Sequence, residues 1–214
     1  MNPTTILCWS CRGMVPTGEG FCPGCRIIQP PDPRQDHFAS FALKPDFTLD
    51  LAALDQGYRE QQQRFHPDLF ATRGATERRY SMEHVTRLNE GYRILKDPLL
   101  RGEYLLKIAG FRSQTPENSA PSDPAFLMEV MELRESLEEV DLKRGDALDH
   151  LTRLRHQVEE ACSGELQALT THFAAWFDSR GQGSLVQAAR HIDRLRYFIR
   201  FIEELDRKEE RSFL

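Results

Sequence analysis

Apolar residues recur at helical spacing through the middle of the chain. One run consists of Leu51, Leu54, Tyr58 and Phe65, and a second consists of Val85, Leu88, Tyr92 and Leu95. Because an α-helix has 3.6 residues per turn, this spacing places the apolar side chains of each run on one face. The pattern predicts a helix that begins after Asp50 and ends at Pro67, and a second helix over 77–96. A shorter helix is predicted from Pro98 to a stop at Gly110.

The C-terminal part of the chain shows three further amphipathic stretches. They predict helices over 124–142, over 146–179, and from Ser184 to about 211. Ser184 followed by Gln187 matches a capping box, which favours a helix start there. Short connections between long helices are typical of an up-down-up bundle. The predicted fold class is therefore all-α, with short hairpin strands expected only near the N-terminus.

The helix predicted over 124–142 carries apolar residues on two faces. With Phe126 set at zero and about 100° per residue, one stripe lies within about 40° and would face the core. It comprises Phe126, Val130, Leu133, Leu137 and Val140. A second set lies about 100° to 200° away, among glutamates: Leu127, Met128 and Met131. Two interpretations stay open: another helix buries this second face, or it is an apolar partner surface with an acidic rim.

Two proline-rich stretches divide the sequence. They read "QPPDPRQD" at 29–36 and "SQTPENSAPSDP" at 113–124. Proline breaks helices and favours extended backbone, so both stretches are predicted to be linkers. The resulting prediction is a cysteine module at 1–29, a linker at 30–37, a helical domain at 38–111, a second linker at 112–123 and a helical bundle at 124–214.

Composition and charge narrow the classes of function. The chain has 214 residues, 29% of them charged, with a net charge of −5. A nucleic-acid-binding surface is not expected, because such surfaces are usually basic. No apolar run reaches membrane-spanning length. The start, "MNPTTILCWSC", does not read as a secretory signal, so a reducing compartment is expected: a bacterial cytoplasm, or the mitochondrial matrix if the source is eukaryotic.

Four of the five cysteines lie close together as two Cys-x-x-Cys pairs: Cys8, Cys11, Cys22 and Cys25. Four thiolates with this spacing favour a single, closed, structural zinc ion. A segment this short has little apolar core of its own, so metal binding would supply its folding energy. Two disulfides, or a redox-active dithiol, are the alternatives. Cys162 lies alone in a helical pattern and is expected to act as a small hydrophobe.

The tripeptide His66-Pro67-Asp68, called the His-Pro-Asp loop below, follows directly on the helix that begins after Asp50. It could be an acid–base pair, a pair of metal ligands or a helix-ending turn. No phosphate-binding loop, nucleophile elbow or second histidine cluster accompanies it, so the sequence does not favour an enzyme. Its position between two amphipathic helices is the informative feature.

A helix, a His-Pro-Asp loop and a second helix together resemble a J-domain. The resemblance implies that the loop and the helix before it dock on a heat-shock chaperone of the DnaK class and stimulate its ATP hydrolysis. The implied chaperone-binding residues are His66, Pro67, Asp68, Arg59 and Arg64. The helix departs from the basic pattern common in that family, because Glu60 and the glutamines at 61–63 stand before the loop.

The domain order, "DPLLRGEYLL" and "FLMEVMELRESLEEV" further resemble HscB, the J-type co-chaperones of iron–sulfur cluster assembly. This resemblance implies a non-enzymatic protein with a DnaK- or HscA-type chaperone and an IscU-type iron–sulfur scaffold as partners, as a monomer or weak homodimer. The scaffold-binding residues that it implies are Leu127, Met128, Met131, Glu132, Glu135, Glu139 and Tyr197. In the last predicted helix, Tyr197 is expected to point away from the apolar face, which comprises Ile192, Leu195, Phe198, Ile199 and Ile202. A J-protein that serves other clients, with a structural zinc module, is the alternative.

Overall fold

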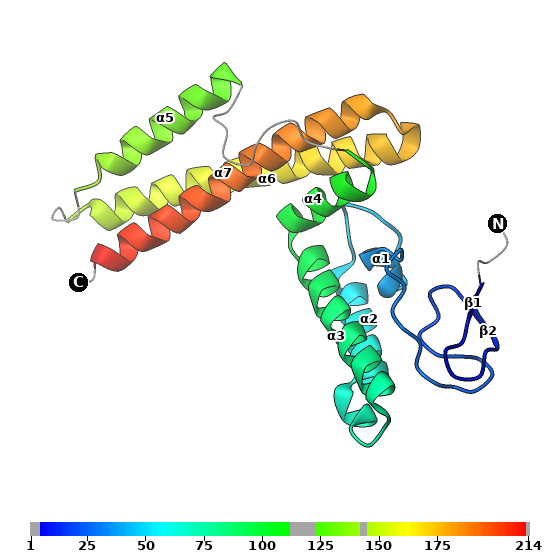
Figure 1. Cartoon of the computed structure of the whole chain (residues 1–214). Coiled ribbons are helices and arrows are strands. Elements are labelled where there is room, and N and C mark those ends of the chain that lie inside the picture. Colours follow the sequence, from blue (N-terminus) through cyan, green and yellow to red (C-terminus); the bar gives the residue numbers. More distant parts are fainter. Residues whose placement is uncertain (1–4, 112–122, 142–144, 213–214) are drawn as a thin grey trace. The chain divides into compact units, whose positions relative to one another are not determined.

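Helices form most of this computed structural model, which describes residues 5–111, 123–141 and 145–212 (Figure 1). The all-α fold class is therefore confirmed. The chain forms two compact units, Met1–Arg101 and Gly102–Leu214. Residues 112–122 of the predicted linker lie outside the described residues. In the described part of the chain, no helix has both the length and the apolar character required to cross a membrane.

The first unit opens with a small hairpin that carries the cysteines. Strand β1 (Thr5–Leu7) pairs antiparallel with β2 (Met14–Pro16), and Ile6 lies opposite Val15. The alternation of a strand turns Val15 inward, where it packs with the buried Cys8 and Cys22. The short strands expected near the N-terminus are thus confirmed, and their core includes two of the cysteine side chains.

A helical hairpin follows in the same unit. Helix α1 (His37–Ser40) leads to α2 (Leu51–Phe65), the 3-10 turn η1 (Pro67–Phe70) and α3 (Ala75–Lys96). Asp50 starts α2, because its Oδ1 accepts hydrogen bonds from the backbone N–H groups of Ala52 and Ala53 at 2.9 and 3.1 Å. Helix α3 begins two residues before the predicted Glu77, whose carboxylate caps the free N–H of Gly74 at 3.2 Å.

The hairpin encloses an apolar core. It is built from the buried side chains of Phe38, Phe41, Phe47, Leu54, Phe65, Leu88 and Leu95. Polar contacts also cross the hairpin: Gln62 Nε2 of α2 donates to Asn89 of α3 at 2.6 Å, and the Tyr92 hydroxyl of α3 donates to Asp55 of α2 at 2.7 Å. The helix α4 (Pro98–Ile108) comes next and ends before Gly110, which has a positive φ of 72°.

The second unit contains a bundle of helices α5 (Pro124–Glu138), α6 (Ala147–Ser179) and α7 (Gln182–Ser212). Long helices α6 and α7 lie antiparallel side by side, and α5 packs against them (Figure 1). Their shared core comprises Phe126, Val130, Leu133, Val140, Leu151, Leu154, Val158, Phe198, Phe201 and Leu205. The predicted core stripe of the first bundle helix is confirmed, with Leu137 partly buried at its edge.

Two helix boundaries in the bundle differ from the prediction. Helix α5 ends at Glu138, although the apolar pattern continued to Val140, which is buried after the helix has ended. The start predicted at Ser184 was wrong, because α7 begins at Gln182 and Ser184 lies in its first turn. Arg180 explains this early start: it adopts the left-handed conformation (φ 55°) and its N–H bonds to the Trp176 carbonyl, so the chain reverses within two residues.

A buried ionic network joins the three helices of the bundle. Glu165 of α6 is only 7% exposed, and its carboxylate lies 2.6 Å from His191 Nδ1 and 2.9 Å from Arg194 Nε. Arg194 also pairs with Glu129 of α5 at 3.0 Å and stacks on the Phe126 ring at 4.6 Å. A charge that is partly buried needs partners of this kind, so the network ties α5 to α6 and α7.

Candidate functional site

The His-Pro-Asp loop is an exposed turn with buried anchors on either side. Its His66 and Asp68 side chains are 52% and 89% exposed, whereas the flanking Phe65 and Phe70 are 4% and 7% exposed. Proline at the first position of η1 fixes the backbone dihedral there, and His66 Nδ1 accepts a hydrogen bond from the Asp68 N–H at 3.3 Å. The turn thus presents an imidazole and a carboxylate to solvent in a defined geometry.

The backbone that leads into the loop is held from the other helix of the hairpin. Ser81 of α3 is fully buried, and its hydroxyl donates to the Phe65 carbonyl at 2.7 Å. That carbonyl is one of the groups at a helix C-terminus that lack a partner within the helix. The loop therefore starts from a fixed point rather than from a frayed helix end.

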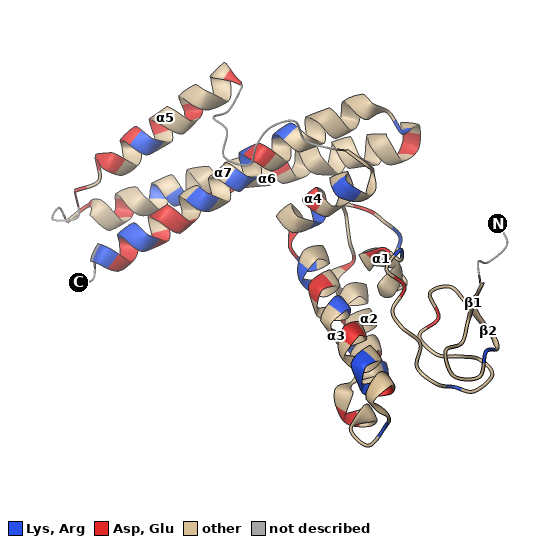
Figure 2. Ribbon diagram, viewed as in Figure 1, with Lys and Arg blue, Asp and Glu red and all other residues tan. Residues whose placement is uncertain are grey.

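Basic side chains lie on both sides of the loop. Arg59 and Arg64, predicted from the preceding helix, are exposed on α2. The sequence interpretation missed three further exposed arginines, Arg73, Arg78 and Arg79, which follow the loop. Figure 2 shows basic positions on α2 and α3 toward the end of the hairpin that carries η1. For Arg78 and Arg79 the signal was present in "ERRY" at 77–80, because a helix that starts so close to the loop has its first turn in the same region.

The four cysteine sulfurs converge on one point. All of them lie within 4.8 Å of one another, and the Cys8–Cys25 and Cys11–Cys22 sulfurs are each 3.7 Å apart. Four sulfurs about 2.3 Å from a tetrahedral ion would lie about 3.8 Å from each other. A disulfide requires about 2.05 Å, and all four thiols are free. The arrangement suits a metal ion bound by all four sulfurs.

The surroundings of the sulfurs favour the thiolate at Cys8 and oppose it at Cys25. Cys8 Sγ accepts hydrogen bonds from the Ser10 N–H at 3.4 Å and from Gln29 Nε2 at 3.3 Å. Burial opposes ionisation of Cys8, but backbone N–H groups at Cys11 and Ser10 outweigh it and lower the pKa of this thiol to about 6. At Cys25 a backbone hydrogen bond from Ile27 is outweighed by burial and the neighbouring sulfurs, which raise the pKa to about 12. Four clustered thiolates need a cation to coexist, which a bound metal would supply.

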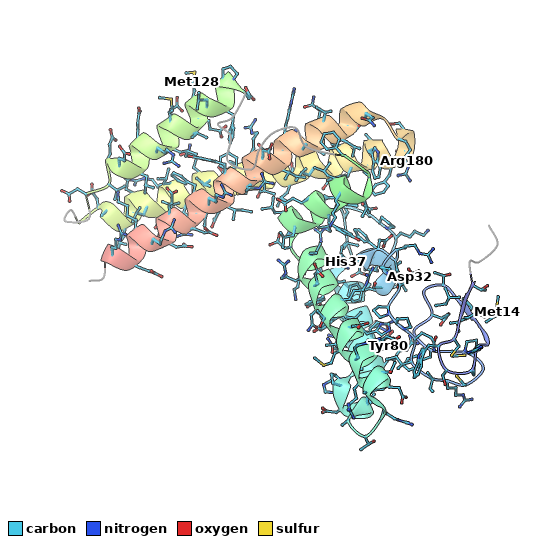
Figure 3. The ribbon with its side chains drawn as sticks, viewed as in Figure 1. Met14, Asp32, His37, Tyr80, Met128 and Arg180 are labelled. Atoms are coloured by element: carbon cyan, nitrogen blue, oxygen red, sulfur yellow. The ribbon has the colours of Figure 1, made fainter. Side chains whose placement is uncertain are left out.

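The second apolar face of α5 is exposed to solvent. Leu127, Met128 and Met131, called the α5 surface below, are 40%, 64% and 53% exposed. Figure 3 shows Met128 on the side of α5 that points away from α6 and α7. Among the described residues no further helix buries this face, so the first of the two open interpretations is wrong. The glutamates around it, Glu132, Glu135 and Glu139, are also exposed, and acidic positions recur along α5 (Figure 2).

Comparison with known proteins decides the family. Residues 122–206 match the family model described as the HSCB C-terminal oligomerisation domain. The chain is 32% identical over 208 residues to the human iron-sulfur cluster co-chaperone protein HscB, covering 94% of this chain and 82% of that protein. The chain belongs to the HscB co-chaperone family. The resemblance seen in the sequence is thereby confirmed.

Further comparisons with HscB proteins agree in sequence and in structure. The HscB homolog of Paraburkholderia phymatum is 41% identical over 177 residues, covering 82% of this chain and 94% of that protein. The crystal structure of human HscB matches with a TM-score of 0.82 and 30% identity over 94% of this chain and 98% of that one. HscB from Vibrio cholerae matches with a TM-score of 0.70 and 33% identity, over 83% of this chain and 99% of that one. These relatives are named as chaperones or co-chaperones.

One of the predicted scaffold-binding residues, Tyr197, has different surroundings from those expected. Tyr197 was expected to point away from the apolar face of its helix, but its ring packs at the edge of the bundle core, edge-on to Phe126 with ring centres 5.7 Å apart. Its hydroxyl accepts a hydrogen bond from Arg134 Nε at 3.1 Å. The reason is that α5 crosses α7 beside this position, which a helical wheel of one helix does not show. Its role in binding a scaffold stays a prediction.

His84 of α3 connects the cysteine module to the hairpin and was not singled out in the sequence. Its Nε2 lies 2.9 Å from the Gln29 carbonyl, and its ring stacks on Phe65 with ring centres 4.0 Å apart. Burial lowers the pKa of His84, and the positive charges of Arg87 and Arg64 lower it further, against the raising effect of the hydrogen bond to Gln29. The neutral imidazole with a proton on Nε2 is therefore the form that fits this contact.

The low pKa of His84 predicts an acid-sensitive first unit. Below the unfolded-state pKa of about 6.5, the unfolded chain binds a proton that the folded chain does not, so stability falls with decreasing pH until the folded-state pKa is reached. One such proton changes the free energy of unfolding by at most about 1.4 kcal/mol per pH unit. His84→Phe keeps a stacking ring without a titrating group, so its stability should depend less on pH. Urea unfolding followed by Trp9 fluorescence, in a Trp176→Phe background, measures the free energy of unfolding of both proteins. If this free energy changed equally with pH in both between pH 7 and 5, the low pKa assigned to His84 would be refuted.

Proposed function

We propose that this chain is a J-type co-chaperone of iron–sulfur cluster assembly, which binds an IscU-type scaffold and stimulates the ATPase of a DnaK- or HscA-type chaperone. The observation that carries the proposal is the exposed His66 and Asp68 pair on a turn with two buried phenylalanine anchors. The membership in the HscB family, with a human relative named as an iron-sulfur cluster co-chaperone, supports the client class.

The loop acts on the chaperone as a preformed contact. His66 can donate or accept a hydrogen bond, the Asp68 carboxylate accepts, and Pro67 limits the entropy lost when the partner orders them. The exposed arginines on either side, Arg59 and Arg64 before the loop and Arg73, Arg78 and Arg79 after it, suit an acidic chaperone surface. The contact replaces the basic helix expected in J-domains with charge drawn from α2, from the turn before α3 and from α3 itself.

The α5 surface holds the scaffold. Met128 and Met131 are flexible and polarisable side chains that adapt to a partner, and Leu127 adds apolar area beside them. The rim of Glu132, Glu135 and Glu139 is negative and would orient a scaffold with complementary basic residues. Tyr197 is retained as a contact through its partly exposed ring.

The two sites work in sequence. The bundle recruits the scaffold with its cluster, and the His-Pro-Asp loop then triggers ATP hydrolysis that locks the chaperone on this client. ATP and magnesium belong to the chaperone, and we infer no enzymatic step on this chain. We further propose that the chain is a monomer or weak homodimer that acts in a bacterial cytoplasm, or in the mitochondrial matrix if its source is eukaryotic.

Zinc is the metal that we propose for the cysteine module. A closed set of four thiolates suits a structural zinc ion with no open coordination position. The ion would be held by Cys8, Cys11, Cys22 and Cys25. It would supply folding energy to the cysteine module, whose core has few apolar side chains.

His66→Gln should abolish most of the chaperone stimulation. The amide of glutamine has a similar size but neither the ring nor the same acceptor geometry, and the loss of one or two strong hydrogen bonds corresponds to roughly a tenfold to hundredfold weaker effect. Steady-state ATPase of the cognate chaperone, with and without scaffold, gives the measurement. His156→Gln, at an exposed histidine of the bundle, is the matched control. Equal stimulation by His66→Gln and wild type would overturn the proposed role of the loop.

Leu127→Ala combined with Met131→Ala should weaken scaffold binding by roughly tenfold or more, because each removes an apolar contact at the centre of the surface. Calorimetric titration of the scaffold measures the effect. Leu148→Ala combined with Val186→Ala removes similarly exposed apolar side chains elsewhere in the bundle and should bind normally. Unchanged affinity in the first variant would favour a J-protein that serves other clients.

The purified protein should contain one tightly held zinc ion per chain, and its four clustered thiols should be protected from alkylation until zinc is chelated. Metal analysis and thiol titration, in a Cys162→Ser background, test this directly. A reactive dithiol in the metal-free native protein, or turnover of a disulfide substrate, would point instead to redox chemistry.

A further inference from the structure

A stack of three rings connects the cysteine module to the residue before the His-Pro-Asp loop. Phe65, the last residue of α2, lies in the middle. The Phe21 ring of the module stacks on Phe65 at 5.2 Å with planes 6° apart, and the His84 ring of α3 stacks on Phe65 at 4.0 Å with planes 10° apart. Near-parallel rings at these distances attract one another beyond their area of burial. The module thus holds one side of the ring whose backbone leads into His66.

The ring stack is connected to the cysteine sulfurs in two ways, one through the backbone and one through hydrogen bonds. Phe21 directly precedes Cys22, so its position follows that of the second Cys-x-x-Cys pair. Gln29 is fully buried; its side-chain amide donates to Cys8 Sγ at 3.3 Å, while its backbone carbonyl lies 2.9 Å from His84 Nε2. The same short segment therefore contacts both a sulfur and a ring of the stack.

The contact between module and hairpin is close-fitting. A Cβ placed on Gly20 would lie 2.3 Å from Phe65 Cζ, so only glycine permits this approach. The Trp9 ring lies edge-on to Tyr80 of α3 with ring centres 6.0 Å apart, and Trp9 Nε1 donates to the Ile28 carbonyl at 2.7 Å. Figure 3 shows Tyr80 on the side of α3 that faces the module. Such complementarity fixes the module in one position on the hairpin.

The module would depend on a bound metal for this shape. Its buried core holds Val15 and two cysteine side chains, with Ile6 packed against them, which is too little apolar surface for independent stability. Without a bound metal, nothing would hold the four sulfurs together, and Phe21 and Gln29 would lose their places beside Phe65 and His84. The Phe65 ring, 4% exposed in the folded chain, would then face water on one side.

We propose that metal binding at the four cysteines positions the His-Pro-Asp loop through Phe21, Gln29 and His84, and thereby regulates how strongly this chain engages its chaperone. These are positioning residues, since none of them is part of the loop. The functional half of this inference rests on the proposed co-chaperone function. The structural half, control of loop geometry by the metal, stands without it.

Two backbone hydrogen bonds of the loop provide a direct readout. The Leu69 and Ala71 N–H groups bond to the His66 and Asp68 carbonyls at 3.0 and 3.3 Å, so their exchange with deuterium reports opening of the turn. Exchange is measured by NMR on the full chain, loaded with zinc and after chelation. We expect both amides to exchange about tenfold faster without metal, because the loss of ring stacking lets the turn open more often.

Phe21→Ala separates the contact from the metal itself. This variant keeps all four cysteines and should retain one zinc per chain, yet exchange at Leu69 and Ala71 should rise toward the metal-free rate. Met14→Ala is the matched control, because Met14 lies in the same module and is 60% exposed. Phe21→Leu, which restores apolar volume but not the flat ring, serves as a second variant should Phe21→Ala lose its metal. Slow exchange at Leu88, in the core of α3, verifies that the hairpin remains folded.

Chaperone ATPase assays on the same samples complete the test. Metal-free protein and zinc-loaded Phe21→Ala should need about tenfold more protein for half-maximal stimulation than wild type or Met14→Ala. Unchanged exchange after chelation, or equal behaviour of Phe21→Ala and Met14→Ala, would overturn the inference while His66→Gln still tests the proposed function. If zinc-loaded wild type stimulates no chaperone, the proposed function fails, and the exchange rates alone decide whether the metal positions the loop.

Discussion

The burial of one ring, Phe65, controls the geometry on which the exposed loop depends. Phe65 ends α2, its carbonyl accepts the Ser81 hydroxyl, and its ring is held between Phe21 and His84. An exposed turn of three residues cannot stabilise its own conformation, because its side chains point into solvent and the entropy of the free chain opposes order. Its rigidity therefore comes from buried neighbours, and part of that burial is supplied by the cysteine module.

A comparable division of roles exists in the bundle. Phe126, Val130 and Leu133 hold α5 in the core, and Arg194 adds an ionic link between Glu129 and the buried Glu165. With one face anchored in this way, α5 can leave Leu127, Met128 and Met131 in solvent without losing its place. Both units thus present a small exposed contact from an element whose opposite side is firmly packed, as transient recognition requires.

Sequence reasoning succeeded where the signal is local. Helical periodicity found the longer helices of both units but not the one-turn helix α1, and Asp50 and Pro67 marked the ends of α2 because capping and proline geometry act within a few residues. The spacing of Cys8, Cys11, Cys22 and Cys25 identified a cluster that the fold brings together. Sequence reasoning placed the start of α7 wrongly at Ser184, because the left-handed turn at Arg180 lets the helix begin earlier. It also placed Tyr197 wrongly, because the surroundings of this side chain depend on the crossing of α5 and α7.

The amino-acid sequence by itself determined the helical class, the four-cysteine motif, the His-Pro-Asp loop and the two faces of α5, since each follows from spacing along the chain. Only the tertiary structure decided that the α5 surface is exposed within the described part of the chain, that arginines from α3 join those of α2 around the loop, and that Phe21, Phe65 and His84 stack. The physical reason is that these features depend on contacts between segments that are distant in sequence, and local propensity carries no information about which segments meet.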